Sequence, residues 1–124
     1  MTTRLRSTMG KRIVGMRGEE LAIEHLQQKG FELVERNYRF ERGEIDAVMR
    51  DAGELVFVEI KARRSSAFGA PEDAVTVAKR NQIRRVAAGF LFEHDIRDTP
   101  CRFDVVAVQW KGSQPEITHI VNAF

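Results

Sequence analysis

The chain has 124 residues, of which 43% are hydrophobic and 31% are charged, and its formal net charge is +2. A chain of this length forms one domain, and these fractions are typical of an ordinary globular protein. Its apolar runs are shorter than the roughly 18 residues that a membrane span needs, so no membrane-spanning segment is expected. The single cysteine cannot form an intrachain disulfide, and the first residues lack the apolar core of a secretory signal, so we expect a cytoplasmic location.

The N-terminal segment is basic. Every charged side chain before Gly18 is positive, and the rest of the chain contains more acidic than basic residues. We expect residues 1–12 to form a flexible basic arm and residues 13–124 to form the domain. The arm could follow the phosphates of a nucleic acid, or it could be a solvated tail.

A helix is predicted from about residue 11 to residue 29. Gly30 follows as its stop signal. Its apolar residues recur at helical spacing, as expected for a buried stripe. They are Ile13, Met16, Ala22, Ile23 and Leu26.

Three strands are predicted next, at residues 31–40, 44–50 and 54–62. The sequence Asp51-Ala52-Gly53 supplies the turn between the second and third strands. These strands form a small antiparallel meander.

A loop at residues 63–71 leads to a second predicted helix, which begins at Pro71-Glu72-Asp73 and runs to about His94. Two more strands follow at residues 102–110 and 116–121. The resulting order, α-β-β-β-α-β-β, predicts an α/β sandwich with a mixed five-stranded sheet. The two helices are expected to cover one face each or to pack together on one face.

Three charged residues interrupt the apolar pattern of the second and third strands, namely Asp46, Glu59 and Lys61. Because side chains alternate along a strand, Glu59 and Lys61 point to the same face. The hairpin turn sets Asp46 opposite Val58 or Glu59, so the two carboxylates are expected to converge.

Two converging carboxylates in a half-buried position repel each other, at a cost of several kcal/mol. A hard divalent cation, Mg²⁺ or Mn²⁺, would relieve this repulsion, since such ions bind one or two carboxylates together with waters and phosphate oxygens. Lys61 could then orient an attacking water. The alternative is an ordinary ion pair between Glu59 and Lys61 at the edge of the sheet.

Asp46 followed by Glu59-Ile60-Lys61 resembles the signature of the PD-(D/E)XK nuclease superfamily, although Ile45 stands where the superfamily name has proline. Archaeal Holliday junction resolvases carry an additional acidic residue on the first helix. The stretch GEELAIEHLQQKGF resembles theirs, and aligning its Gly-Phe favours Glu19 as the matching residue, with Glu20 as the second choice. The resemblance implies a restriction-endonuclease-like fold and metal binding by Asp46, Glu59 and Glu19.

A closer resemblance covers almost the whole chain from Gly18. The motifs GEELA, RNYR, GEIDAVMRD, LVFVEIKARR, FGAPEDAVTVAKR, CRFDVVAV and HIVNAF occur in order. Together they are similar to the uncharacterised bacterial YraN-like family (UPF0102), which is assigned to the same nuclease fold. This resemblance implies the fold more directly than it implies an activity.

Lys79 lies on the expected buried stripe of the second helix. It either extends to water along its aliphatic stem or reaches the acidic cluster or a substrate phosphate. Gln82 lies beside it, and Arg63 and Arg64 follow the third strand, where they could contact a nucleic-acid backbone or form a solvated surface.

The sequence therefore predicts a Mg²⁺- or Mn²⁺-dependent endonuclease in which Glu19, Asp46, Glu59 and Lys61 are catalytic and DNA is a more probable substrate than RNA. Cutting two strands of a duplex or junction requires two sites, so we expect a homodimer. The competing hypothesis is a non-catalytic module that keeps the fold and binds a nucleic acid or a protein partner.

Overall fold

A computed structural model describes the backbone of residues 3–64 and 75–124, and within these ranges the side chains from residue 13 onward. The elements follow the order α-β-β-β-α-β-β. Their bounds are α1 Thr3–Gln28, β1 Glu32–Phe40, β2 Gly43–Asp51, β3 Glu54–Arg63, α2 Val77–Glu93, β4 Cys101–Lys111 and β5 Gln114–Ile120. The predicted order is confirmed, and the ends of the strands differ from the predictions by one or two residues.

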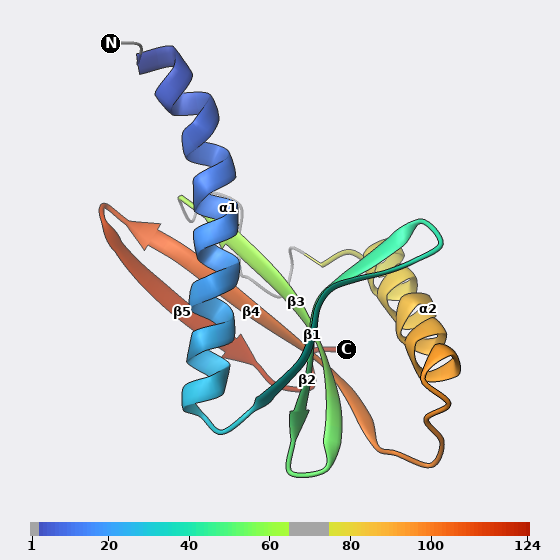
Figure 1. The fold of residues 1–124 in the computed structure, drawn as a ribbon. Coiled ribbons are helices and arrows are strands. Elements are labelled where there is room, and N and C mark those ends of the chain that lie inside the picture. The colour runs from blue at the N-terminus through green and yellow to red at the C-terminus, as the bar shows by residue number, and fades with distance from the viewer. Residues whose placement is uncertain (1–2, 65–74) are drawn as a thin grey trace.

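The five strands form one sheet in the order β1-β2-β3-β4-β5 (Figure 1). The β3–β4 pair is parallel, whereas the other three pairs are antiparallel. A parallel pair needs a crossover connection, and here the connection contains α2. The predicted mixed sheet is therefore confirmed.

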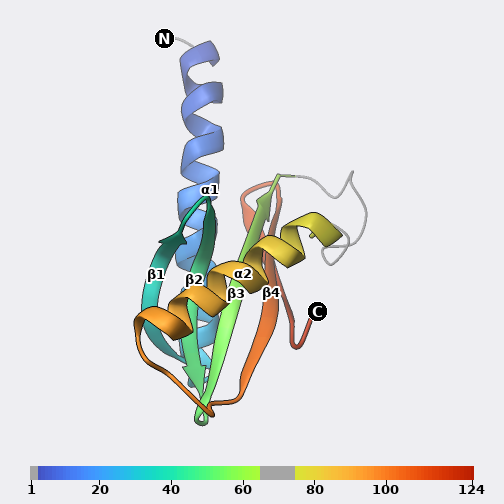
Figure 2. The ribbon, with the colours of Figure 1, turned by 90° about the vertical axis from the view of Figure 1, so that its right-hand side faces the viewer.

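The two helices cover opposite faces of the sheet (Figure 2). On one face, Ala22 and Leu26 of α1 pack against Val58 of β3. On the other face, Ile83 of α2 packs in a cluster with Phe57 of β3. Successive residues of β3 therefore contribute to two different cores, which explains why this strand is apolar along most of its length.

Two turns take the conformations that their residues predict. Gly30 ends α1 with a φ of 97°, and the backbone N–H of Phe31 donates to the carbonyl of Leu26. Between β2 and β3, Ala52 and Gly53 have φ values of 50° and 86°, as a tight two-residue hairpin requires.

The first helix begins earlier than the sequence predicts, at Thr3 rather than at residue 11. Its first half extends beyond the sheet (Figure 1). As a result, Ile13 and Met16 are 56% and 58% exposed, so the prediction that they are buried is wrong. The division into a basic arm of residues 1–12 and a domain of residues 13–124 stays a prediction.

The second helix begins later than predicted, at Val77. Thr76 has extended backbone angles, and its hydroxyl accepts a hydrogen bond from the backbone N–H of Lys79, which is a standard helix cap. The proposed start at residues 71–73 lies outside the described residues. Val75 is buried although it precedes the helix.

Helix α1 lies close to β3 at Gly18. A methyl group at this position would come within 2.5 Å of the Cβ of Ala62. Because residue 18 has no side chain, α1 can lie this close to β3. The next residue of the helix is Glu19. Within the described residues, neither helix is long and apolar enough to cross a membrane.

We expect Gly18→Ala to destabilise the fold by about 1–3 kcal/mol, because the added methyl group must push α1 away from β3. Gly15→Ala is the matched control in the same helix, since its methyl group would meet nothing within 4 Å. That substitution should stabilise the protein by about 0.5–1 kcal/mol through helix propensity. Urea unfolding measures both values, and equal effects at the two positions would contradict this account of the packing.

Candidate active site

The strands β2 and β3 separate next to Asp46. The last residues that pair between them are Ala47 and Val58, and continuing the register by one step sets Asp46 opposite Glu59. Beyond this point, the backbone N–H of Ile60 donates a 2.7 Å hydrogen bond to Oδ2 of Asp46. The convergence predicted from the sequence is confirmed, whereas the backbone contact was missed because a backbone donor leaves no signature in the sequence.

Glu59 is the most buried carboxylate of this group, with 4% of its surface exposed. Lys61 lies on the same side of β3, and its Nζ is 3.5 Å from Oε2 of Glu59. The Nζ of Lys79, from α2, is 3.8 Å from the same oxygen. Of the two alternatives for Lys79, the structure therefore shows the one in which it reaches the acidic cluster.

The two lysines do not fully compensate the negative charges of Asp46 and Glu59. Burial, the charge of Asp46 and a hydrogen bond with Asp46 raise the pKa of Glu59 to about 7, although Lys79 and Lys61 act in the opposite direction. A carboxyl group with so high a pKa is characteristic of functional sites, where charge is concentrated at a cost in stability.

Glu19 brings a third carboxylate from α1. Its Oε1 is buried and has no hydrogen-bond partner among the described residues. Burial raises the pKa of Glu19, and the charges of Asp46 and Glu44 raise it further, while Arg36 lowers it.

Glu20, the second choice in the sequence, points elsewhere. It is exposed, and it forms a 3.1 Å ion pair with Arg17 of the same helix. The structure therefore selects Glu19 as the helix carboxylate near Asp46.

The donor set suits a hard cation, because it consists of carboxylate oxygens. The buried oxygen of Glu19 that lacks a partner is the observation that favours a ligand. Within residues 3–64 and 75–124, however, no group of three His, Cys, Asp or Glu side chains is already arranged to hold a metal ion. The site is a carboxylate pair with a third carboxylate nearby, rather than a complete three-ligand cage.

The sequence also assigned Gln82, Arg63 and Arg64 to nucleic-acid binding. The amide of Gln82 donates to the backbone carbonyl of Arg42, 3.5 Å away, in the turn between β1 and β2. Arg63 is half-buried at the end of β3, and Arg64 follows it in an exposed position. Contact of these residues with a nucleic acid stays a prediction.

A second charged cluster surrounds the fully buried Asp104 of β4. Its carboxylate accepts hydrogen bonds from Arg102 at 3.0 Å, from His119 at 2.7 Å and from the backbone N–H of Asn122 at 3.0 Å. Burial alone would raise the pKa of Asp104, but these hydrogen bonds lower it below its usual value. Arg102 and Asp104 are two residues apart on β4, so strand alternation places them on the same face, where they form an ion pair of 3.0 Å.

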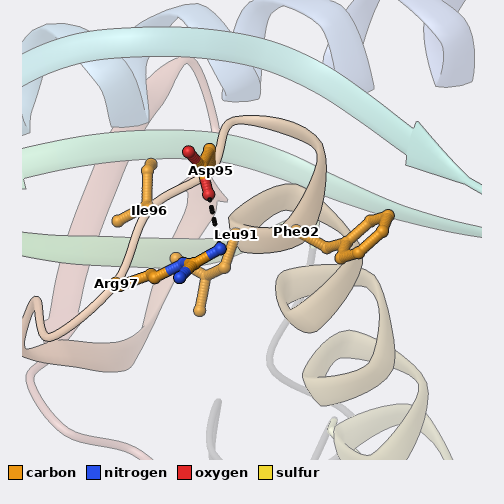
Figure 3. Close-up of a pocket in the computed structure, with 5 residues that line it drawn as sticks. All are labelled: Leu91, Phe92, Asp95, Ile96 and Arg97. Carbon is orange, nitrogen blue, oxygen red and sulfur yellow. Dashed lines mark ion pairs between the residues drawn. The ribbon is translucent and has the colours of Figure 1, made fainter.

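A hollow of about 240 Å³ lies at the other end of α2 from Lys79 (Figure 3). Its residues are Leu91, Phe92, Asp95, Ile96 and Arg97. The helical rise places Leu91 about 18 Å along the axis from Lys79. Asp95 and Arg97 form an exposed ion pair of 3.2 Å, so this hollow is separate from the acidic cluster.

The fold and the cluster define an α/β sandwich whose charged site lies where two central strands separate. Residues 18–108 match the model of the uncharacterised protein family UPF0102, to which the chain therefore belongs. This is the family that the sequence motifs indicated.

Several relatives carry the name UPF0102 protein. The one from Pelobacter propionicus is 46% identical over 116 residues, which cover 91% of this chain and 83% of the relative. The relative from Geobacter metallireducens is 42% identical, with 90% and 91% covered. The relative from Clavibacter michiganensis is 45% identical, with 89% and 94% covered. The range matched by the family model, residues 18–108, spans the positions of the acidic cluster.

We expect Asp104→Asn to destabilise the fold by about 1–3 kcal/mol, because it removes the buried charge that accepts hydrogen bonds from Arg102 and from the backbone N–H of Asn122. Arg102 keeps its ion pairs with Asp51 and Glu54. Asp95→Asn is the matched control in an exposed pair and should change stability by less than about 0.5 kcal/mol. Thermal and urea unfolding at neutral pH measure both changes.

The same experiment has a pH dependence with a fixed sign. The fold lowers the pKa of Asp104 below its value of 3.8 in the unfolded chain. The contribution of Asp104 to the free energy of unfolding is therefore complete above pH 3.8 and is lost as the pH falls through the lower pKa of the folded state. The wild type should therefore lose more stability than Asp104→Asn on acidification below about pH 4. Parallel losses in the two proteins would contradict the assignment.

Proposed function

We propose that the chain is a metal-dependent endonuclease that hydrolyses phosphodiester bonds of DNA. One observation carries the proposal. Asp46 and Glu59 face each other where β2 and β3 separate, and the pKa of Glu59 is raised to about 7 in their shared environment. Crowded carboxylates that lack full compensation favour a bound cation.

In this proposal, Asp46 and Glu59 hold Mg²⁺ or Mn²⁺, and Glu19 binds it directly or through water. The cation would supply a Lewis acid for the phosphate and a lowered pKa for a bound water. The proposed ligands are carboxylate oxygens from three different elements, α1, β2 and β3, which is a donor set that these hard ions prefer.

Lys61 is the residue that we propose to orient the attacking water and to stabilise charge on the phosphate oxygens. Its side chain is 31% exposed, and that of Lys79 is 35% exposed, so both extend from buried Glu59 to solvent. Lys79 would act as a second cation for the phosphate, on the α2 side of the site.

Further contacts to the nucleic acid are proposed for Gln82, Arg63 and Arg64. The choice of DNA, including branched DNA, follows the resemblance to Holliday junction resolvases. Each chain carries one such cluster, so cutting both strands of a duplex or junction would require two copies, and we propose a homodimer for that reason.

We expect Mg²⁺ or Mn²⁺ to raise the melting temperature of the wild type. At a metal concentration one hundred times Kd, the gain is about 2.7 kcal/mol. Asp46→Asn should lose this gain but remain folded, because the asparagine oxygen can still accept the hydrogen bond from Ile60. Asp95→Asn removes an exposed carboxylate and should keep the gain. Equal metal effects in Asp46→Asn and the wild type would contradict metal binding by Asp46.

We expect the wild type to cleave at least one end-labelled DNA among four-way junction, flap, duplex and single strand in Mg²⁺ or Mn²⁺. Asp46→Asn and Lys61→Ala should each lower the rate by at least about a hundredfold. Lys29→Ala is the control, since Lys29 is an exposed lysine just after the end of α1, far along the chain from Lys61 and outside the proposed contacts. One RNA substrate tests the choice of DNA.

A non-catalytic module is the competing proposal, and one observation favours it. Glu59 already has two lysine partners, so the cluster can exist as an internal ion-pair network. Absence of cleavage on every substrate, together with nucleic-acid binding that is unchanged in Asp46→Asn, would select this alternative.

A further inference from the structure

An open hollow of about 380 Å³ lies beside α1, and its lining comes from four separate parts of the chain. Val14 belongs to α1, Arg64 follows the end of β3, Trp110 belongs to β4, and Gly112 lies in the turn between β4 and β5. These parts of the chain lie at the same end of the sheet in both ribbon views (Figures 1 and 2). The volume is within the usual range for ligand pockets.

Trp110 is held in position by the fold. It is partly buried and packs against the core between α1 and the sheet. Its ring is 3.7 Å from where a Cβ of Gly18 would stand. One part of the indole is therefore fixed against α1, while another part lines the hollow, which makes it a rigid aromatic surface.

The chemistry of the lining identifies the class of ligand. Among the described residues, the lining supplies one aromatic ring, one guanidinium group and no acidic side chain. Aromatic rings bind nucleobases by stacking, and arginine binds the phosphates between them. We propose that this hollow is a base-stacking subsite for a single-stranded nucleic acid, with a base on Trp110 and a neighbouring phosphate on Arg64. This inference rests on the proposed function.

The position of the hollow agrees with this assignment. Arg64 is three residues beyond Lys61 along the chain, which is about 10 Å at the rise of a strand. Val14 precedes Glu19 by five residues, which is about 7.5 Å along α1. Trp110 packs with α1 on one face of the sheet, whereas Lys79 of α2 reaches Glu59 from the other face. A strand whose phosphate contacts the acidic cluster would therefore pass around the end of β3 to place its next nucleotides in the hollow.

Trp110 is also the natural probe, because it is the only tryptophan of the chain. The experiment uses the full-length Asp46→Asn protein without divalent metal, so that binding is measured without cleavage. An oligothymidylate and an abasic oligonucleotide of equal length are titrated, and anisotropy of an end label reports binding independently. We expect the oligothymidylate to quench the emission of Trp110 and the abasic strand to leave it unchanged.

Substitutions then test the two roles separately. Trp110→Leu should weaken binding of the oligothymidylate at least about fivefold, and Trp110→Phe should retain most of the affinity, because a ring remains for stacking. Arg64→Gln should reduce the slope of log affinity against log salt by about one. Arg50→Gln is its matched control, since Arg50 is an exposed arginine at the other end of the β2–β3 pair.

The outcomes separate this inference from the nuclease proposal. Binding without any quenching, or equal quenching by the abasic strand, overturns base stacking and leaves the nuclease proposal intact. Quenching by the oligothymidylate supports the subsite, even where the wild type cleaves no substrate. Absence of binding to either oligonucleotide overturns the subsite, while the metal and cleavage experiments still decide the nuclease proposal.

Discussion

The hydrogen bond from the N–H of Ile60 to the carboxylate of Asp46 determines the arrangement around the site. Where β2 and β3 stop pairing, the backbone donor of Ile60 needs a new partner, and the side chain of Asp46 replaces the backbone carbonyl. This replacement fixes Asp46 between the separating strands and opposite Glu59. The carboxylate therefore has a structural role, whatever else it binds.

The burial of Glu59 has consequences for the packing of the whole domain. A buried carboxylate costs several kcal/mol unless it is compensated, and its two lysine partners come from β3 and from α2. The ion pair with Lys79 thus links α2 to the sheet at the site, while Gly18 lets α1 approach from the opposite face. The charged region thus contacts α2 directly, whereas the close approach of α1 depends on the small residues Gly18 and Ala62.

The sequence predicts the fold well because its signals are local. Strand alternation and the Asp51-Ala52-Gly53 turn set the register of β2 and β3, and that register alone brings Asp46 opposite Glu59. The starts of the helices could not be predicted as well, since a helix cap depends on one side chain. Thr76 provides that cap, although the Pro71-Glu72-Asp73 sequence has the stronger signature.

Tertiary contacts decided what local patterns left open. Glu19 and Glu20 are neighbours on one helix, but Glu19 is affected by the charge of Asp46 whereas Glu20 is exposed and pairs with Arg17. Ile13 and Met16 have the spacing of buried residues, but the sheet does not extend beneath them. The extent of a neighbouring element is not encoded in the periodicity of a helix.

The two charged clusters described above differ in how completely their carboxylates are hydrogen-bonded and compensated by positive charge. Buried Asp104 has hydrogen bonds from Arg102, His119 and a backbone N–H, so its pKa is lowered and its charge is stabilised by the fold. In the cluster of Asp46 and Glu59, the pKa of Glu59 is raised, and an adjoining buried oxygen of Glu19 has no hydrogen-bond partner within the described part of the chain. Buried polar networks that only stabilise a fold are normally complete. The incomplete cluster is therefore the one that favours an external ligand, and this contrast within a single chain supports the proposed cation site.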